Sequence, residues 1–315
     1  QSNYRVIFFG TDELSAAVLQ TLLDLKVNVV GVVTRADKIQ GRKKEVVFSE
    51  VKKLALANNL NLLQPIKLRD EIQTFLNLKP DLILTCSYGR IIPEEIINAP
   101  QFKSVNIHPS LLPKYRGASP IQSAVLNNDK ETGVTFLYMT KDLDNGNILF
   151  QESFPISDKI TSKELRSKVK DVIINMLKKY FVKLFDLNIK SIVQSEKDVV
   201  FCSIIEREDE KIDWNKNAKD VDAQIRALYD KPIAYTLINN QPIKVHAAHI
   251  SDLDSSHQAP GRILNINKEG IFIACKDKAL VLSTIQLPGK KPKKVSLLIN
   301  VNCPIKVNKI FTNWN

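Results

Sequence analysis

Long apolar runs are missing from the 315-residue sequence, and none approaches the roughly 20 residues that a membrane-spanning helix requires. The first three residues lead directly into a strand-like run, without the apolar stretch of a secretory signal peptide. The composition, 44% hydrophobic and 25% charged, supplies enough apolar side chains for a large core and two domains. We therefore expect a soluble, globular, cytoplasmic protein that does not bind membranes.

Cysteine is scarce, and no C-x-x-C pair joins the four that occur, Cys86, Cys202, Cys275 and Cys303. Close cysteine pairs are typical of zinc sites, and disulfides belong mainly to small secreted domains, so we interpret these residues as buried free thiols. No sequence feature near Cys86 indicates an activated thiolate, and packing is the preferred reading. His246 and His249 lie three apart on a predicted strand and so face opposite sides, which argues against a metal site.

The dinucleotide-binding pattern G-x-G-x-x-G is also missing, since the first turn, "FFGTDEL", contains only Gly10. The chain nevertheless begins with a strand, "YRVIFFG", a helix, "DELSAAVLQTLLDL", and a second strand, "VNVVGVVT". Further buried runs, "PDLILTCSY" and "SVNIHP", follow helical stretches. The alternation predicts a Rossmann-like, doubly wound, mostly parallel α/β sheet, whose ligands bind beyond the carboxyl ends of its strands.

The pattern changes in the second half of the chain. Thr161 and Glu164 form a predicted capping box for a helix over about residues 162–187. From about residue 207 one helix, "NAKDVDAQIRALYD", is followed by short strands separated by Gly, Pro and Asn. We predict a catalytic domain over 1–188, a linker over 189–206 and a small antiparallel β-barrel of OB-like type over 207–315.

Acidic residues are scarce near the C-terminus, where residues 259–315 contain ten Lys and Arg but only two Asp and Glu. The whole chain has a net charge of +11. Two segments concentrate the positive charge, "GRKK" at 41–44 and "GKKPKK" at 289–294. Each could contact the phosphates of a nucleic acid or simply keep the surface solvated, and charge by itself leaves both readings open.

Asn106 and His108 stand out at the end of the predicted strand "SVNIH". Residues two apart on a strand project from the same face, so both side chains would face the crevice at the sheet edge. An amide offers a donor for a carbonyl oxygen, and an imidazole exchanges protons near neutrality, which suits acyl-group transfer. Asp144, on the predicted turn "DNG", is a third candidate, although turn chemistry alone would explain an aspartate there.

A stiff loop, "HPSLLPKYRGASP", follows His108. Pro109 and Pro113 restrict its backbone, and Gly117 permits close approach or positive φ. The sequence "NIHPSLLPKYRGASPIQSAVLN" and the later "TGVTFLYMTKDLDNGNIL" closely resemble the folate-dependent formyltransferases. Further segments, among them "FFGTDELSAAVL", "KIDW" and "IQLPGKKPKK", resemble those members of the family that act on methionyl-tRNA, and the resemblance covers nearly the whole chain.

The resemblance implies an enzyme that transfers a formyl group from 10-formyltetrahydrofolate, as co-substrate, to the amino group of initiator methionyl-tRNA for translation initiation. The family's catalytic residues fall on Asn106, His108 and Asp144. Its folate contacts fall on Ser110, Leu111, Leu112 and Pro113. The basic segments would contact tRNA through Arg42, Lys43, Lys44, Lys290, Lys291, Lys293 and Lys294. No metal is required, and we expect a monomer.

In the expected mechanism, Asn106 and a protonated His108 stabilise the developing oxyanion, and Asp144 orients His108 and assists proton removal. Two alternatives remain open from the sequence. The same catalytic residues would serve a formyltransferase for a nucleotide-sugar amine or a hydrolase of formyltetrahydrofolate. A non-catalytic RNA-binding protein on this fold is the alternative from another class.

Overall fold

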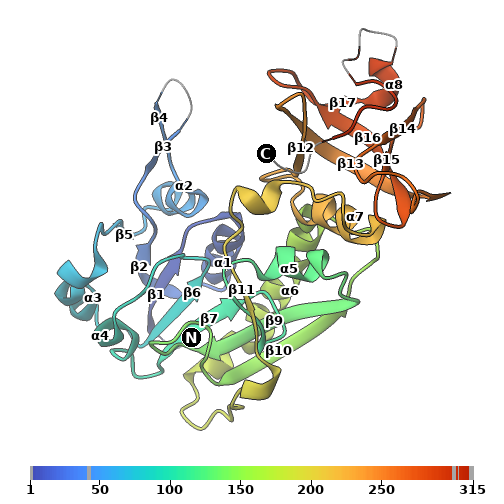
Figure 1. Cartoon of the computed structure of the whole chain (residues 1–315). Coiled ribbons are helices and arrows are strands. Elements are labelled where there is room, and N and C mark those ends of the chain that lie inside the picture. The colour runs from blue at the N-terminus through green and yellow to red at the C-terminus, as the bar shows by residue number, and fades with distance from the viewer. Residues whose placement is uncertain (1–2, 41–43, 300–302, 304, 312–315) are drawn as a thin grey trace. The chain divides into compact units, whose positions relative to one another are not determined.

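The computed structural model describes residues 3–40, 44–299, 303 and 305–311, and its chain forms two compact units, labelled by element in Figure 1. The first unit comprises Gln1–Pro120, Thr132–Phe154 and Arg166–Cys202. The second comprises Ile121–Glu131, Pro155–Leu165 and Ser203–Asn315. No helix in the described residues is both long and apolar enough to cross a membrane.

The first unit is built on a seven-stranded sheet. In spatial order its strands are β10 (Ile148–Pro155), β9 (Glu131–Tyr138), β7 (Ser104–His108), β6 (Leu82–Cys86), β1 (Arg5–Gly10), β2 (Asn28–Val33) and β5 (Leu62–Leu63). The pairs from β7 to β5 are all parallel, and β9 runs antiparallel to β7. The predicted mostly parallel α/β sheet is therefore confirmed.

Strand β1 is buried on both faces, which explains its continuous apolar sequence. Ile7 and Phe9 point to one face and pack in a cluster with Phe75 of α3 and Ile96 of α4. Val6, which alternates with them along the strand, is also fully buried and points to the opposite face. Helices must therefore cover both faces.

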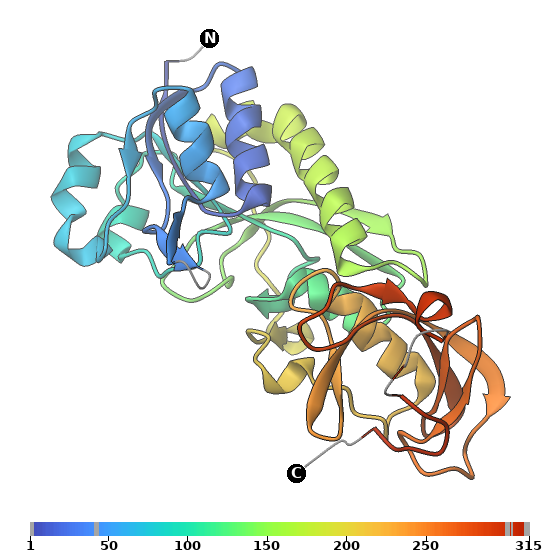
Figure 2. The ribbon, with the colours of Figure 1, turned by 90° about the horizontal axis from the view of Figure 1, so that it is seen from above.

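Helices occupy both sides of this sheet, and Figure 2 shows α1, α2 and the first unit's part of α6 along one side, with α3 and α4 on the other. Asp12 caps the N-terminus of α1, and Ser49 caps that of α2, each by accepting a backbone N–H. The helices of the first unit are α1 (Glu13–Asp24), α2 (Glu50–Ala57), α3 (Ile72–Asn77), α4 (Glu94–Ile97) and most of α6 (Ser162–Tyr180). Helix α5 (Pro120–Leu126) belongs mainly to the second unit.

The predicted capping box at the start of α6 is confirmed. The backbone N–H of Glu164 donates to Thr161 Oγ1 at 3.2 Å, and the Glu164 carboxylate accepts from the backbone N–H of Thr161 at 2.9 Å. The α-helix ends at Tyr180, earlier than predicted, and Phe181–Phe185 continue as a 3₁₀ helix. The tighter helix aligns residues three apart, so Phe181 and Leu184 are buried together.

Two small strand pairs lie outside the main sheet. Strands β3 (Lys38–Gln40) and β4 (Glu45–Val47) are antiparallel and flank residues 41–43, which are not described. Strand β8 (Lys114–Gly117) pairs in parallel with β11 (Val200–Cys202). Part of the predicted loop after His108 is thus a strand, and its partner belongs to the segment predicted as a linker.

The second unit is dominated by an antiparallel half-barrel, where the short strands predicted a small antiparallel β-barrel. Its strands are β12 (Tyr235–Ile238), β13 (Gln241–Asp254), β16 (Lys278–Gln286), β15 (Ile271–Ala274) and β14 (Ile263–Ile266), with β17 (Lys293–Lys294) paired to β16. Helices α7 (Ala218–Ala227) and α8 (Val295–Leu298) complete it. The fold-class prediction, an α/β sheet domain followed by a small β domain, is confirmed.

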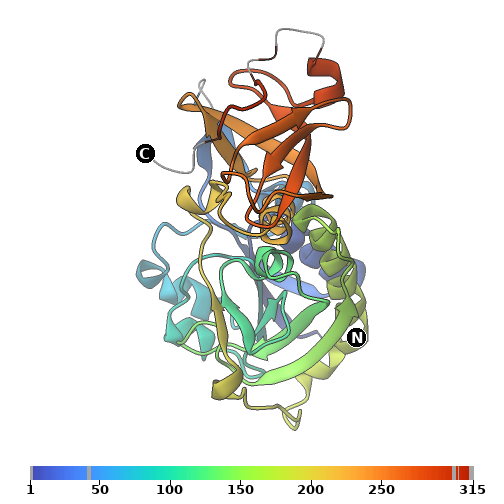
Figure 3. The ribbon, with the colours of Figure 1, turned by 45° about the vertical axis from the view of Figure 1, so that its right-hand side comes forward.

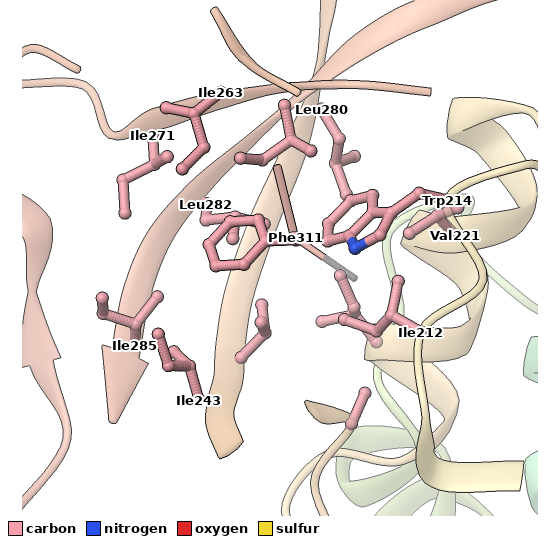
Figure 4. Packing of buried hydrophobic residues seen from close by; sticks show 14 of the residues in the cluster. Ile212, Trp214, Val221, Ile243, Ile263, Ile271, Leu280, Leu282, Ile285 and Phe311 are labelled. Carbon is pink, nitrogen blue, oxygen red and sulfur yellow. The ribbon is translucent and has the colours of Figure 1, made fainter. Parts of the chain in front are cut away.

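The core of this half-barrel forms where apolar strand faces meet α7, as Figure 4 shows. Trp214 is fully buried and stacks on Phe311 with ring centroids 6.0 Å apart. Its indole Nε1–H donates to Thr236 Oγ1 at 2.9 Å, so the polar atom of the indole is satisfied inside the core.

Candidate active site

The site lies at the carboxyl end of β7, where Asn106 and His108 project on the same side of the strand. Asn106 pairs in register with Thr85 of β6, and His108 pairs with Thr135 of β9. His108 is only 4% exposed, whereas Asn106 is half-buried. The parallel strands thus bring a buried imidazole and a more accessible amide to one edge of the sheet.

Asp144 reaches the same edge from the turn between β9 and β10. Its carboxylate Oδ1 lies 3.3 Å from Asn106 Nδ2 and 3.6 Å from His108 Nδ1, and Oδ2 accepts the backbone N–H of Gly117 at 3.0 Å. The Asp144 side chain is 6% exposed. The three residues predicted from the sequence therefore lie together at this edge of the sheet.

The orientation of the Asn106 amide follows from its two neighbours. A carboxylate only accepts hydrogen bonds, so the amide nitrogen faces Asp144. The amide oxygen then faces Thr85, whose hydroxyl donates to it at 2.7 Å. One N–H of the Asn106 amide contacts Asp144, and the second has no acceptor among the described residues. That second N–H is the one suited to bind a carbonyl oxygen.

The two ring nitrogens of His108 have different partners. Nε2 lies 2.8 Å from the backbone carbonyl oxygen of Tyr115, which can only accept, so Nε2 carries a proton. Nδ1 faces Asp144. Because Nε2 is held by the backbone, Nδ1 is the atom through which His108 can exchange a proton.

Strands β9 and β10 hold the backbone of the loop that follows β7, which contains Ser110, Leu111, Leu112 and Pro113. Thr135, fully buried, donates its hydroxyl to the Ser110 carbonyl at 2.7 Å and accepts from the Leu112 N–H at 3.2 Å. Gln151 donates to Thr135 Oγ1 and to the Leu112 carbonyl. The Leu112 side chain packs with Leu137 and Ile148, while Leu111 and Pro113 are half-buried.

Ser110 is fully buried, and its hydroxyl donates to the carbonyl of Lys114 at 2.6 Å. Gly117 follows at φ 125°, a conformation that favours glycine, and a Cβ there would lie 2.0 Å from the carbonyl oxygen of Cys202. Only glycine lets the loop approach β11 this closely while donating its N–H to Asp144. This explains the predicted need for glycine at position 117.

Sequence reasoning missed the residues that support the site. Thr85 is the hydroxyl-bearing residue in the otherwise apolar strand "LILTC", which was its only sequence signal. Thr135 lies on β9 and Gln151 on β10, and the sequence analysis assigned neither of them a role near the site. Gln194, in the predicted linker, donates to the backbone carbonyls of Asp144 and Gly146. No local pattern connects a linker residue with a turn 50 residues earlier.

The predicted tRNA-binding residues fall into three groups. Lys44, beside β4, is exposed in the first unit. The second unit exposes a lysine group around β17, Lys290, Lys291, Lys293 and Lys294. Arg42 and Lys43 lie outside the described residues.

Two thiols are deeply buried and held as neutral groups. Burial raises the pKa of Cys86 far above its usual range and raises the pKa of Cys275 to about 12. None of the four cysteines, all of them described, forms a disulfide, and Cys202 and Cys303 are partly exposed. Within the described residues no three His, Cys, Asp or Glu side chains gather as a metal site would require.

Two family models match the chain: "Formyl transferase" over residues 4–180 and "Formyl transferase, C-terminal domain" over residues 204–302. Among solved structures, the N-formyltransferase of Helicobacter canadensis, in complex with folinic acid and dTDP-3-aminofucose, superposes with a TM-score of 0.67. It shares 20% sequence identity over 89% of this chain and 98% of its own, which is evidence of a common fold.

Similarity to curated proteins is higher. The methionyl-tRNA formyltransferase of Mycoplasma mycoides subsp. mycoides SC is 41% identical over 315 residues, covering 99% of both chains. That of Ureaplasma urealyticum serovar 10 is 41% identical over 302 residues, 96% of this chain and 98% of its own. On this full-length similarity and the two family matches, the chain belongs to the formyltransferase family, among the methionyl-tRNA formyltransferases.

Proposed function

We propose that this chain transfers the formyl group of 10-formyltetrahydrofolate to the free α-amino group of initiator methionyl-tRNA, giving N-formylmethionyl-tRNA for translation initiation. The observation that carries the chemistry is the convergence of Asn106, His108 and Asp144 at one sheet edge. The acceptor follows from the relatives that share 41% identity over nearly their full length.

The reaction forms a bond between the amine nitrogen and the formyl carbon and breaks the bond between that carbon and N10 of the folate. One proton leaves the amine and one reaches N10, so no oxidant, reductant or metal is needed for balance. Negative charge develops on the formyl oxygen, and the second N–H of Asn106 stabilises it. One well-placed donor of this kind contributes about 3 kcal/mol, or roughly 10² to 10³ in rate.

His108 supplies a second N–H from Nδ1 when protonated, and the same atom later returns a proton to the leaving nitrogen. Asp144 faces Nδ1 at 3.6 Å and orients the ring. Its carboxylate also assists removal of the proton from the ammonium group of the acceptor. The Tyr115 carbonyl prevents the imidazole from turning over, because rotation would place an unprotonated nitrogen against an acceptor. These roles use the two side chains only at the atoms that face the site.

The proposed folate loop has the rigidity and apolar surface that suit a flat folate ring system. It consists of Ser110, Leu111, Leu112 and Pro113. Its backbone is fixed by Thr135 and Gln151, and Leu111 and Pro113 keep part of their apolar surface accessible. Apolar side chains on a preorganised backbone bind planar ligands at low entropic cost. Ser110 contributes through loop shape, since its hydroxyl bonds to Lys114.

We assign tRNA contacts to Arg42, Lys43 and Lys44 and to the lysine group around β17, Lys290, Lys291, Lys293 and Lys294. Exposed lysines gain affinity for nucleic acid by releasing condensed counterions from phosphates. In this assignment residues 1–188 carry catalysis, 189–206 link the domains and 207–315 help to hold tRNA. We further propose that the chain acts as a monomer, and that it acts in the cytoplasm, where its tRNA acceptor is used in translation.

The decisive experiment compares acceptors under identical conditions. Purified protein and 10-formyltetrahydrofolate are incubated with methionyl-charged initiator tRNA, methionyl-charged elongator tRNA and a nucleotide amino sugar. We expect turnover with initiator tRNA to exceed that with the sugar by at least about 10³. Preferred turnover of the sugar would overturn the acceptor assignment. Binding of tRNA without any folate-dependent turnover would identify a non-catalytic RNA-binding protein.

A further inference from the structure

The segment between the two family matches, residues 181–203, is in contact with the active site. We propose that Gln194 in this segment is a positioning residue that holds the Asp144 turn in its reactive geometry, with Arg116 as its partner. The inference rests on the proposed function and deepens it. It says that the position of the Asp144 carboxylate during formyl transfer is fixed by a residue outside the strands and loops of the catalytic site.

The Gln194 side chain makes three hydrogen bonds and is only 5% exposed. Its two amide N–H groups donate to the backbone carbonyls of Asp144 and Gly146, both at 2.8 Å. Its amide oxygen accepts from Arg116 Nε at 3.0 Å. Carbonyls only accept and a guanidinium only donates, so the amide has a single possible orientation. This amide clamps both sides of residue 145.

The clamped turn has a backbone that needs outside support. Asp144 has a φ of 52°, in the left-handed region that favours glycine. Gly146 is buried, and a Cβ there would lie 1.7 Å from the Tyr138 carbonyl oxygen, so the turn presses against β9. Without Gln194, the carbonyl of Gly146 would be buried without its donor, a costly state that favours rearrangement of the turn.

Arg116 connects the clamp to the other side of Asp144. Its guanidinium belongs to a residue only 4% exposed and pairs with Glu196 at 2.9 Å as well as with Gln194. The next residue, Gly117, donates its N–H to Asp144 Oδ2. Gln194 therefore holds the main chain of Asp144. Arg116, which donates to Gln194, also fixes the position of the adjacent Gly117, whose N–H donates to the Asp144 carboxylate.

Gln194 is itself held on a fixed backbone. Ile192 exchanges two backbone hydrogen bonds with Ile148 of β10, at 2.7 and 2.8 Å. On the other side, β11 pairs with β8, and Figure 3 shows this yellow segment running beside the teal strand of the catalytic loop. Because its backbone is held on both sides, Gln194 can fix the geometry of the Asp144 turn. A glutamine on an unsupported linker could not.

The consequence for catalysis follows from distance. Asp144 acts on His108 Nδ1 across 3.6 Å and on Asn106 across 3.3 Å. A displacement of about 1 Å in such a site can reduce turnover by about 10² without loss of substrate binding. We expect Gln194→Leu, which keeps the size but removes all three hydrogen bonds, to lower kcat by 10- to 100-fold with KM for both substrates within about 2-fold.

Gln224 offers a matched control. It is a partly buried glutamine in the second unit whose Nε2 also bridges two backbone carbonyls, those of Asp209 and Lys211, at 2.9 Å each. Gln224→Leu removes the same kind of contact, and we expect it to change thermal stability while leaving kcat within about 2-fold. An equal loss of kcat in both variants at equal loss of Tm would attribute the effect to stability and overturn the inference.

A double-mutant cycle separates positioning from general damage. If Gln194 acts through Asp144, then Gln194→Leu in an Asp144→Asn background should lower single-turnover formylation by less than about 3-fold. A further loss of 10-fold or more in that background would overturn the inference. If Gln194→Leu does not fold, Gln194→Asn, which shortens the reach of the amide by one methylene, carries the same expectations.

The cycle also distinguishes this inference from the proposed function. Near-normal turnover of Asp144→Asn would sink the catalytic assignment of Asp144, and with it any positioning role. A strong loss in Asp144→Asn combined with kcat within 2-fold of wild type in Gln194→Leu would overturn the positioning role alone. A strong loss in both, with no added loss in the double variant, is the result we expect.

Discussion

His108 Nδ1 lies 3.6 Å from Asp144 Oδ1, although 35 residues separate the two in sequence. The other ring nitrogen of His108 is held by the Tyr115 carbonyl, so the ring presents only Nδ1 to the carboxylate. The two side chains are 5% and 6% exposed. Burial lowers the local dielectric, so their interaction is stronger than between the same groups in water.

The first prediction concerns this pair. We expect His108→Ala and Asp144→Ala each to lower kcat by about 10² to 10³, because each removes a proton-handling or charge-stabilising group. Equilibrium binding of methionyl-tRNA should stay within about 2-fold, since neither residue belongs to the proposed tRNA surfaces. Steady-state formylation and filter binding measure the two quantities. Near-normal formylation by both variants would contradict the assigned roles.

The second prediction concerns Thr85, which donates to the Asn106 amide oxygen. Thr85→Val keeps the shape but leaves the amide oxygen without its donor, so Asn106 loses its fixed orientation. We expect kcat to fall by about 10-fold, a smaller loss than removal of the amide itself, because one hydrogen bond contributes about 1 kcal/mol. Thr85→Ser retains the hydroxyl and serves as control. Equal kcat in Thr85→Val and wild type would show that Asn106 needs no such support.

The third prediction concerns the lysine group around β17. Replacing Lys290, Lys291, Lys293 and Lys294 together by Gln should weaken tRNA binding and flatten its salt dependence. The slope of log affinity against log salt is negative, and each lost contact to duplex phosphate reduces its magnitude by about 0.9. A control variant removes four exposed lysines of the first unit, Lys26, Lys67, Lys79 and Lys178. Matching slopes in both variants would exclude the lysine group from the interface.

The fourth prediction uses the raised thiol pKa values. Since burial raises the pKa of Cys275 to about 12, its reactive thiolate is about 10⁻⁴ of the population at pH 8 and becomes a major form only as the pH approaches 12. Cys86 is fully buried, and its pKa is also raised. We expect iodoacetamide at pH 8 to modify Cys202 and Cys303 first in the native protein, as read by peptide mass spectrometry. Urea should expose all four, and rapid native labelling of Cys86 would contradict the packing.

The fifth prediction concerns the core of the half-barrel. Trp214→Ala removes a fully buried indole, its stacking on Phe311 and its hydrogen bond to Thr236. Large-to-small core substitutions of this type cost about 3 to 5 kcal/mol. Circular dichroism should show that Trp214→Ala unfolds at a lower urea concentration than the wild type. Trp214→Phe should lose less free energy of unfolding than Trp214→Ala. A transition unchanged in Trp214→Ala would mean that the second unit does not depend on this core.

Local sequence was sufficient to predict many of the strands, helices and turns of this protein. The apolar run of β1 predicted a strand buried on both faces, and the Thr161–Glu164 box predicted the start of α6, because both depend on residues near in the chain. The "NIH" strand end and the "DNG" turn pointed to three residues that the fold brings together, since strand alternation and turn preference are also local. The end of α6 was predicted too late in the chain, because burial of Phe181 and Leu184 against the folded unit favours a 3₁₀ turn after Tyr180.

The sequence by itself determined the class of fold, the polar pair at the end of β7 and the family to which the chain belongs. Only the tertiary structure decided which atoms meet: Thr85 on Asn106, Tyr115 on His108, and Gln194 on the Asp144 turn. The physical reason is that hydrogen-bond donors and acceptors are paired by position in space. Strand order and register, which arise when the whole sheet assembles, place residues 50 apart in sequence within 2.8 Å of each other.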